Sequence, residues 1–149
     1  MFLAQSDAAS AAHGIGVMFG GLIGLAIILL PAIFYCLTLQ KALSRCAPEN
    51  RAMQPGMVWL LFIPLFNIVW QFFVVINVAK SLGAEFQKRG MAEDPQPGKT
   101  IGLVTCILVC CGIIPIINFF SGIAALICWI IYWVKIAGYS NKLAGPAAV

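Results

Sequence analysis

The sequence predicts an all-α, polytopic membrane protein, and three observations support this fold class. Of its 149 residues 62% are hydrophobic and 9% are charged, a composition unlike that of a soluble domain. Apolar stretches cover roughly residues 15–39, 57–78, 101–117 and 119–136, and the first exceeds the ~20 residues that cross ~30 Å of hydrocarbon. A short motif also occurs twice. We therefore predict a single membrane domain over residues 1–149.

The repeated motif is Ile-Pro-x-x-Asn, at residues 63–67 and 114–118. Proline lacks an amide hydrogen and displaces the residue before it from helical geometry, so a helix that reaches Pro64 or Pro115 tends to stop. The following asparagine, Asn67 or Asn118, can cap the next helix. We predict that both motifs are apices of helical hairpins inside the bilayer, over residues 57–85 and 101–139. The alternative is a proline kink in a continuous spanning helix, which gives a four-helix transmembrane bundle.

The first spanning helix is expected over residues 15–39. Gly16, Gly20 and Gly24 follow one another at four-residue spacing, which allows two helix backbones to approach closely in lipid. We predict that this glycine stripe packs against this chain, a second copy or another membrane protein. The N-terminal segment 1–14 contains no lysine or arginine, unlike a cleavable signal peptide, and we expect it to be retained.

The charge distribution favours the two-hairpin topology. Four crossings would place six basic residues on one side and three on the other, whereas two hairpins place all nine on one side, in agreement with the positive-inside rule. The N-terminus is then outside and the C-terminus cytoplasmic, with a polar loop at 86–100 and a tail at 140–149. The arm before the first motif is too short to cross, so that hairpin is expected to be re-entrant or shallow. The nine basic residues are Lys41, Arg45, Arg51, Lys80, Lys88, Arg89, Lys99, Lys135 and Lys142.

Uncharged polar side chains recur within the apolar segments. Four of them are expected to share one side of a helix: Asn67, Gln71, Asn77 and Ser81. We predict one of two roles for them, the lining of a path for water or solute, or hydrogen bonds between helices. Thr105, Asn118 and Ser121 are also polar at depth.

The basic loop residues either determine topology or contact anionic lipid or an acidic partner. The predicted contact residues are Lys41, Arg45, Arg51, Lys88 and Arg89.

The sequence offers little catalytic chemistry. No nucleotide-binding or hydrolase motif occurs, and no Asp or Glu lies well inside an apolar span, which argues against an ion-coupled pump. Cys106, Cys110 and Cys111 form a cluster without a CxxC motif, and His13 is distant in sequence. We therefore expect no enzyme activity, no cofactor, no metal site and no nucleic-acid partner.

Two stretches resemble known membrane proteins. Residues 111–118, with the apolar helix that ends at Lys135, resemble a hairpin of uncharacterised small bacterial membrane proteins related to the small four-helix component of the chloroplast inner-envelope import machinery. The stretch from Cys46 through the first motif to Gly90 is similar to small bacterial inner-membrane proteins of unknown function. The resemblance implies a bacterial inner-membrane location and a compact polytopic fold, and no activity.

These observations predict a small structural or accessory membrane subunit that assembles with itself or a larger membrane complex. The alternative is a homo-oligomeric pore or small-solute channel built from the glycine stripe and the polar side chains that begin at Asn67.

Overall fold

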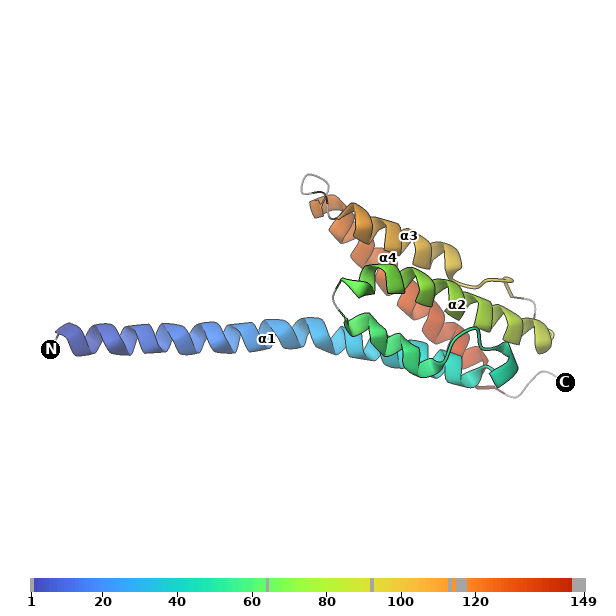
Figure 1. Cartoon of the computed structure of the whole chain (residues 1–149), viewed down its shortest axis with the longest axis horizontal. Coiled ribbons are helices and arrows are strands. Elements are labelled where there is room, and N and C mark those ends of the chain that lie inside the picture. Colours follow the sequence, from blue (N-terminus) through green and yellow to red (C-terminus); the bar gives the residue numbers. More distant parts are fainter. Residues whose placement is uncertain (1, 64, 92, 113, 115–117, 146–149) are drawn as a thin grey trace. The chain divides into compact units, whose positions relative to one another are not determined.

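The computed structural model describes residues 2–63, 65–91, 93–112, 114 and 118–145, with the side chains of residues 2–13 and 15 left out. All regular secondary structure in these ranges is helical. Its α-helices and 3-10 helices are, in order, α1 (Phe2–Arg45), η1 (Pro48–Asn50), η2 (Pro55–Phe62), α2 (Phe66–Lys88), α3 (Lys99–Cys111) and α4 (Asn118–Lys142) (Figure 1). Three helical stretches within these ranges are long and apolar enough to cross a membrane, Gly16–Arg45, Phe66–Lys88 and Asn118–Lys142.

The chain divides into two compact units, Met1–Tyr35 and Cys36–Val149. The first unit contains only the N-terminal part of α1, which is longer at both ends than the predicted helix over 15–39 and continues through Pro31. Most of its described large apolar side chains are exposed, for example Val17 and Ile28 at 74% and 70%. Such a surface is stable when lipid or another protein surrounds it.

The second unit consists of the end of α1, the two 3-10 helices and α2 to α4. The chain reverses between η2 and α2 and again between α3 and α4 (Figure 1). Both reversals lie towards one end, the apex end, whereas the loops before Pro55 and after Lys88 and the end of α4 lie towards the other, the loop end (Figure 1). The first arm, η2, has only eight residues, which agrees with the short arm expected from the sequence.

The two motifs share one backbone hydrogen bond between their last and first residues. The Asn67 N–H donates to the Ile63 carbonyl at 2.9 Å, and the Asn118 N–H donates to the Ile114 carbonyl at 3.0 Å. Pro64 and Pro115 lie outside the described residues. The prediction that the motif asparagine caps the next helix is wrong at Asn67, because Leu65 is the N-cap residue of α2 and the helix start has no side-chain cap hydrogen bond. The asparagine closes the turn through its main chain, so its side-chain amide can point elsewhere.

Glycine allows α3 to approach its neighbours closely. A Cβ atom at Gly102 would lie 2.5 Å from Val75 Cγ1 on α2 and 2.9 Å from Tyr132 Cε2 on α4. Both neighbours are buried, as is Ile136 one turn further along α4. The three helices therefore pack tightly at this level, and a larger residue at position 102 would separate them.

Glu85, near the end of α2, joins the first loop to that helix. Its side chain is buried at 4% exposure. Oε2 accepts hydrogen bonds from the Ala47 N–H and from Asn50 Nδ2, and Oε1 accepts one from Arg89 Nε, all at 2.8 Å. One carboxylate thus satisfies three donors from two segments.

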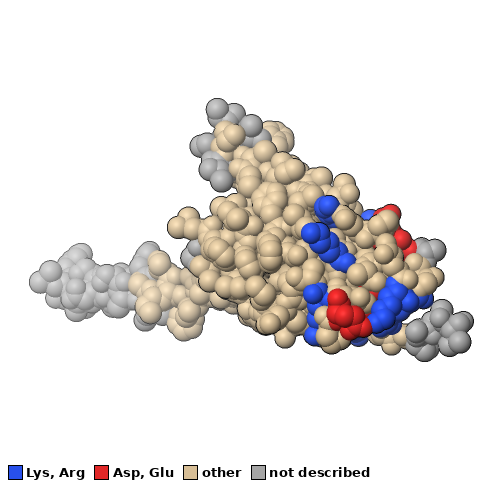
Figure 2. Space-filling view, turned by 45° about the vertical axis from the view of Figure 1, so that its right-hand side comes forward, with Lys and Arg blue, Asp and Glu red and all other residues tan. Residues whose placement is uncertain are grey.

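Arginine side chains connect the same region to the end of α4. Arg89 Nη1 donates to the Leu143 carbonyl at 3.0 Å, and Arg45 Nη1 donates to Ser140 Oγ at 2.9 Å and to the Ser140 carbonyl. Basic and acidic side chains gather towards the loop end on the face seen in Figure 2. The loop end is therefore held together by charged and polar groups, whereas the level of Gly102 is held together by apolar packing.

Candidate functional site

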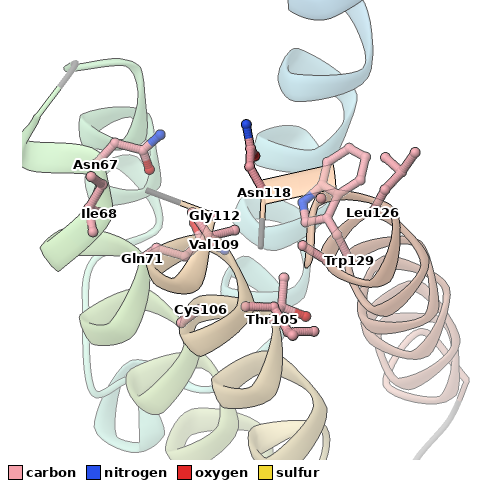
Figure 3. Close-up of a pocket in the computed structure, with 13 residues that line it drawn as sticks. Asn67, Ile68, Gln71, Thr105, Cys106, Val109, Gly112, Asn118, Leu126 and Trp129 are labelled. Carbon is pink, nitrogen blue, oxygen red and sulfur yellow. The ribbon is translucent and has the colours of Figure 1, made fainter. Parts of the chain in front are cut away.

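A cavity of about 550 Å³ lies between α2, α3 and α4 towards the apex end (Figure 3). Its polar lining consists of Asn67 and Gln71 from α2, Thr105 from α3 and Asn118 from α4. The remaining wall is apolar and includes Ile68, Leu108, Val109, Ala125, Leu126 and Trp129. A few uncharged polar groups on an apolar wall are typical of small-molecule pockets.

The repeated motif brings its two asparagines to the same cavity. Asn67 lies in the first turn of α2 and Asn118 is the first residue of α4, and both side chains are drawn at the apex end of the cavity in Figure 3. Gly112 lies beside the second asparagine, since a Cβ there would be in ordinary van der Waals contact, 3.5 Å from Asn118 Oδ1 and 3.4 Å from Ser121 Oγ. The sequence predicted Asn67 as a possible lining residue of a polar path, and the structure adds Asn118 from the second motif to the same cavity.

Gln71 and Thr105 lie deeper than the asparagines (Figure 3). Thr105 Oγ1 donates to the Ile101 carbonyl at 2.9 Å, so its oxygen can still accept a hydrogen bond from a guest. No charged side chain lines the cavity in the part of the chain that is described. The lining can therefore donate and accept hydrogen bonds with water or a neutral guest, and it offers no general acid or base of the usual carboxylate or imidazole kind.

The cavity does not continue towards the loop end along the described helices. One turn beyond Thr105 on α3, Gly102 meets Val75 and Tyr132 in the tight packing described above. The cavity therefore lies on the apex side of the tight packing at Gly102.

The predicted polar side of α2 separates into two parts. Asn67 and Gln71 line the cavity, whereas Asn77 and Ser81 do not. Asn77 Nδ2 donates to the Phe73 carbonyl at 2.7 Å, and Ser81 Oγ donates to the Asn77 carbonyl at 2.7 Å and accepts from the Ala52 N–H at 2.9 Å. Ser81 thus holds the first loop against α2. Sequence reasoning missed Gly112 and Trp129 as cavity residues, because only the turn between α3 and α4 brings them near Asn67.

Most of the predicted lipid-contact or partner-contact cations already bind groups of the chain itself. Arg51 donates to the Cys46 and Ser44 carbonyls at 2.9 Å, and Lys88 forms an exposed ion pair with Glu49. Arg45 and Arg89 take part in the loop-end contacts described above. Of the five predicted residues, Lys41 alone has no hydrogen bond or ion pair recorded among the described residues.

The cysteines are free thiols, and Cys36, Cys46 and Cys106 are buried. Cys46 Sγ lies 3.5 Å from the Ala42 carbonyl oxygen, and burial raises the pKa of this thiol to about 11. A thiol with such a pKa is almost entirely protonated at neutral pH and reacts slowly. Among the described residues no group of three or more His, Cys, Asp or Glu side chains could hold a metal ion.

The glycine stripe of α1 faces open space. A Cβ atom at Gly16, Gly20 or Gly24 would have no described atom within 4 Å. The stripe thus has room for a helix outside the described part of this chain, as close packing through small residues requires.

No family model matches the chain, and no curated protein or solved structure matches it either. The resemblance to small bacterial membrane proteins therefore stays a prediction.

Proposed function

We propose that this protein is a small, non-enzymatic accessory subunit of the bacterial inner membrane, which assembles with itself or a larger membrane complex through α1. The observation that supports the proposal is the exposed apolar surface of α1 with its open glycine positions. Small residues allow close backbone contact, which drives helix association in lipid, where apolar side chains gain nothing by leaving their surroundings.

The proposed orientation places the N-terminus outside and the loop end in the cytoplasm. All nine lysine and arginine residues belong to the second unit, and its two loops lie at one end together with the end of α4. With that end in the cytoplasm, the distribution obeys the positive-inside rule.

The glycine stripe gives the first prediction. Gly20→Leu adds a bulky side chain in the centre of the stripe, and we expect it to dissociate the assembly in mild detergent. Gly21→Leu is the matched control, because it adds the same side chain about 100° around the helix. Particle mass, measured together with the co-purifying proteins, distinguishes the two variants. Equal loss of assembly in both, or a wild-type particle that is a lone monomer, would contradict the proposal.

A second prediction concerns the topology, tested with single thiols in a background without other cysteines. Buried Cys46 is a poor reporter, so we place the thiols at the exposed positions Gln54→Cys and Gln96→Cys. A membrane-impermeant maleimide should label neither in intact spheroplasts and both after permeabilisation. Ser6→Cys should be labelled from outside and Ala144→Cys should not.

A four-crossing protein gives a different labelling pattern. It places positions 54 and 96 on opposite faces, so one thiol is labelled in intact spheroplasts and the other is protected. That outcome would falsify the proposed orientation.

The alternative function, a homo-oligomeric pore, requires a path between copies, because the cavity of a single chain stops at Gly102. A symmetric oligomer without foreign proteins, reconstituted in liposomes that then leak small solutes, would favour the pore. Tight liposomes favour the accessory subunit.

A further inference from the structure

Three α-helices of the second unit each carry a lysine at nearly the same level. Gly102, Val75 and Tyr132 meet and define a common reference level. Lys99 precedes Gly102 by three residues, Lys80 follows Val75 by five, and Lys135 follows Tyr132 by three. At about 1.5 Å per residue, all three lie about 5 to 8 Å from the reference level towards the loop end.

The end of α1 adds a fourth lysine. Trp133 Nε1 on α4 donates to Thr38 Oγ1 on α1 at 2.9 Å, which sets the register of the two helices. Lys41 lies three residues beyond Thr38, and Lys135 lies two residues beyond Trp133, both towards the loop end. Each α-helix thus contributes one residue to a lysine belt, which consists of Lys41, Lys80, Lys99 and Lys135.

The lysine belt lacks acidic partners. Lys41, Lys80 and Lys135 are exposed, and no ion pair is recorded for them among the described residues. Lys99 donates to the Gln96 side-chain oxygen, which is neutral. By contrast, the five cations nearer the loop end bind carboxylates or carbonyl groups of the chain: Arg45, Arg51, Lys88, Arg89 and Lys142.

The belt marks a boundary on the surface of the second unit. On its apex side the helices present exposed apolar side chains, such as Val134 and Ile131 on α4 and Phe73 on α2, at 65%, 43% and 40%. On its other side lie the paired charges, and Figure 2 shows basic side chains towards that end of the face in view. Lysine stems can lie along apolar surface while their ammonium groups reach a polar layer.

We propose that the lysine belt binds the phosphate groups of anionic phospholipids in the leaflet on the loop side. Four ammonium groups without acidic partners, next to an apolar surface, match an anionic headgroup attached to acyl chains. The inference rests on the proposed membrane insertion and is independent of the assembly through α1. Of the five cations predicted from sequence to contact lipid, the belt keeps only Lys41. It adds three lysines that the sequence did not single out, Lys80, Lys99 and Lys135.

The experiment uses the full chain in phosphatidylcholine vesicles that contain a rising fraction of dibrominated phosphatidylglycerol. Bromine quenches the fluorescence of nearby tryptophans. Trp133 lies next to the belt, because its Nε1 donates a hydrogen bond to Thr38 Oγ1. The degree of quenching therefore reports the relative association constant of the anionic lipid. Each well-placed lysine contributes about a fivefold factor to this constant. The double variant Lys80→Gln/Lys135→Gln should therefore lower it about 30-fold, and raised salt should weaken wild-type binding.

The matched control is Lys88→Gln/Lys142→Gln, which removes the same charge from residues that are already paired and should change the constant less than threefold. Lys80→Arg/Lys135→Arg should retain wild-type binding. A second double variant, Lys41→Gln/Lys99→Gln, changes the belt lysines of the other two helices and should lower the association constant in the same way. It replaces the first double variant if that one does not fold. Equal losses in the belt and control variants, no loss in either, or no preference for phosphatidylglycerol over phosphatidylcholine would overturn the proposal. Failed assembly with an intact lipid preference would count against the accessory role alone.

Discussion

Replacing Gly83 with alanine is expected to unfold the second unit or to destabilise it by about 3 kcal/mol, at the upper end of overpacking effects. A Cβ atom at position 83 on α2 would lie 1.9 Å from the Pro95 carbonyl oxygen and 2.8 Å from its carbonyl carbon. Both atoms are backbone and cannot turn aside as a side chain can. The polar loop after α2 would have to leave the helix, and the contacts that it makes would be lost.

Gly138→Ala is the matched control for this substitution. Gly138 is also helical, and a Cβ there would have no described atom within 4 Å. Alanine is preferred to glycine in a helix by about 0.5–1 kcal/mol, so this variant should be slightly more stable than the wild type. Thermal unfolding in detergent, followed by circular dichroism, measures both variants. Stabilisation by both substitutions would show that the loop does not pack on Gly83.

Removal of the Glu85 carboxylate should have the other large effect. Glu85→Ala leaves the Ala47 N–H, the Asn50 amide and the Arg89 guanidinium without their acceptor in a buried position. Breaking a buried charge pair by removing one partner costs about 3–5 kcal/mol. We expect a large drop in the unfolding midpoint and faster proteolysis of the loop between α1 and η2.

Glu49→Ala is the control for the loss of a carboxylate. Glu49 pairs with Lys88, but both side chains are more than half exposed, at 59% and 54%. Water and salt screen such a pair, so its loss should change the unfolding midpoint little. Glu85→Gln should fall between wild type and Glu85→Ala, because it keeps one acceptor oxygen and loses the charge. Equal midpoints for Glu85→Ala and Glu49→Ala would refute the role of Glu85.

The helical reversals could be predicted from sequence because proline acts locally. The Ile-Pro-x-x-Asn motif marked where η2 gives way to α2 and where α3 gives way to α4, to within a few residues. The role of its asparagine could not be predicted, because the direction of the side chain depends on whether the amide or the main chain closes the turn. At Asn67 the main chain closes it.

Close approaches and charge pairs could not be predicted because they depend on tertiary neighbours. Sequence spacing singled out Gly16, Gly20 and Gly24, yet among the described glycines the tightest approaches to other elements are at Gly83 and Gly102, which have no such spacing. The same limit applies to the basic residues. Which of them is bound within the chain depends on carboxylates and carbonyls brought near by the fold, such as Glu85 beside Arg89.

The proposed lipid contact of the lysine belt, together with the positions of the two turns, would set how deeply the second unit enters a bilayer. From Lys80 to the start of α2 is about 21 Å along the helix, and from Lys135 to the start of α4 about 26 Å, at 1.5 Å per residue. Both lengths are less than the ~30 Å of the hydrocarbon layer. With the belt at the phosphates of one leaflet, the hairpins end inside the bilayer unless the surrounding bilayer thins to meet their apices. Such hydrophobic mismatch is relieved when short elements gather, so the lysines that set the depth would also favour association of this protein with its neighbours.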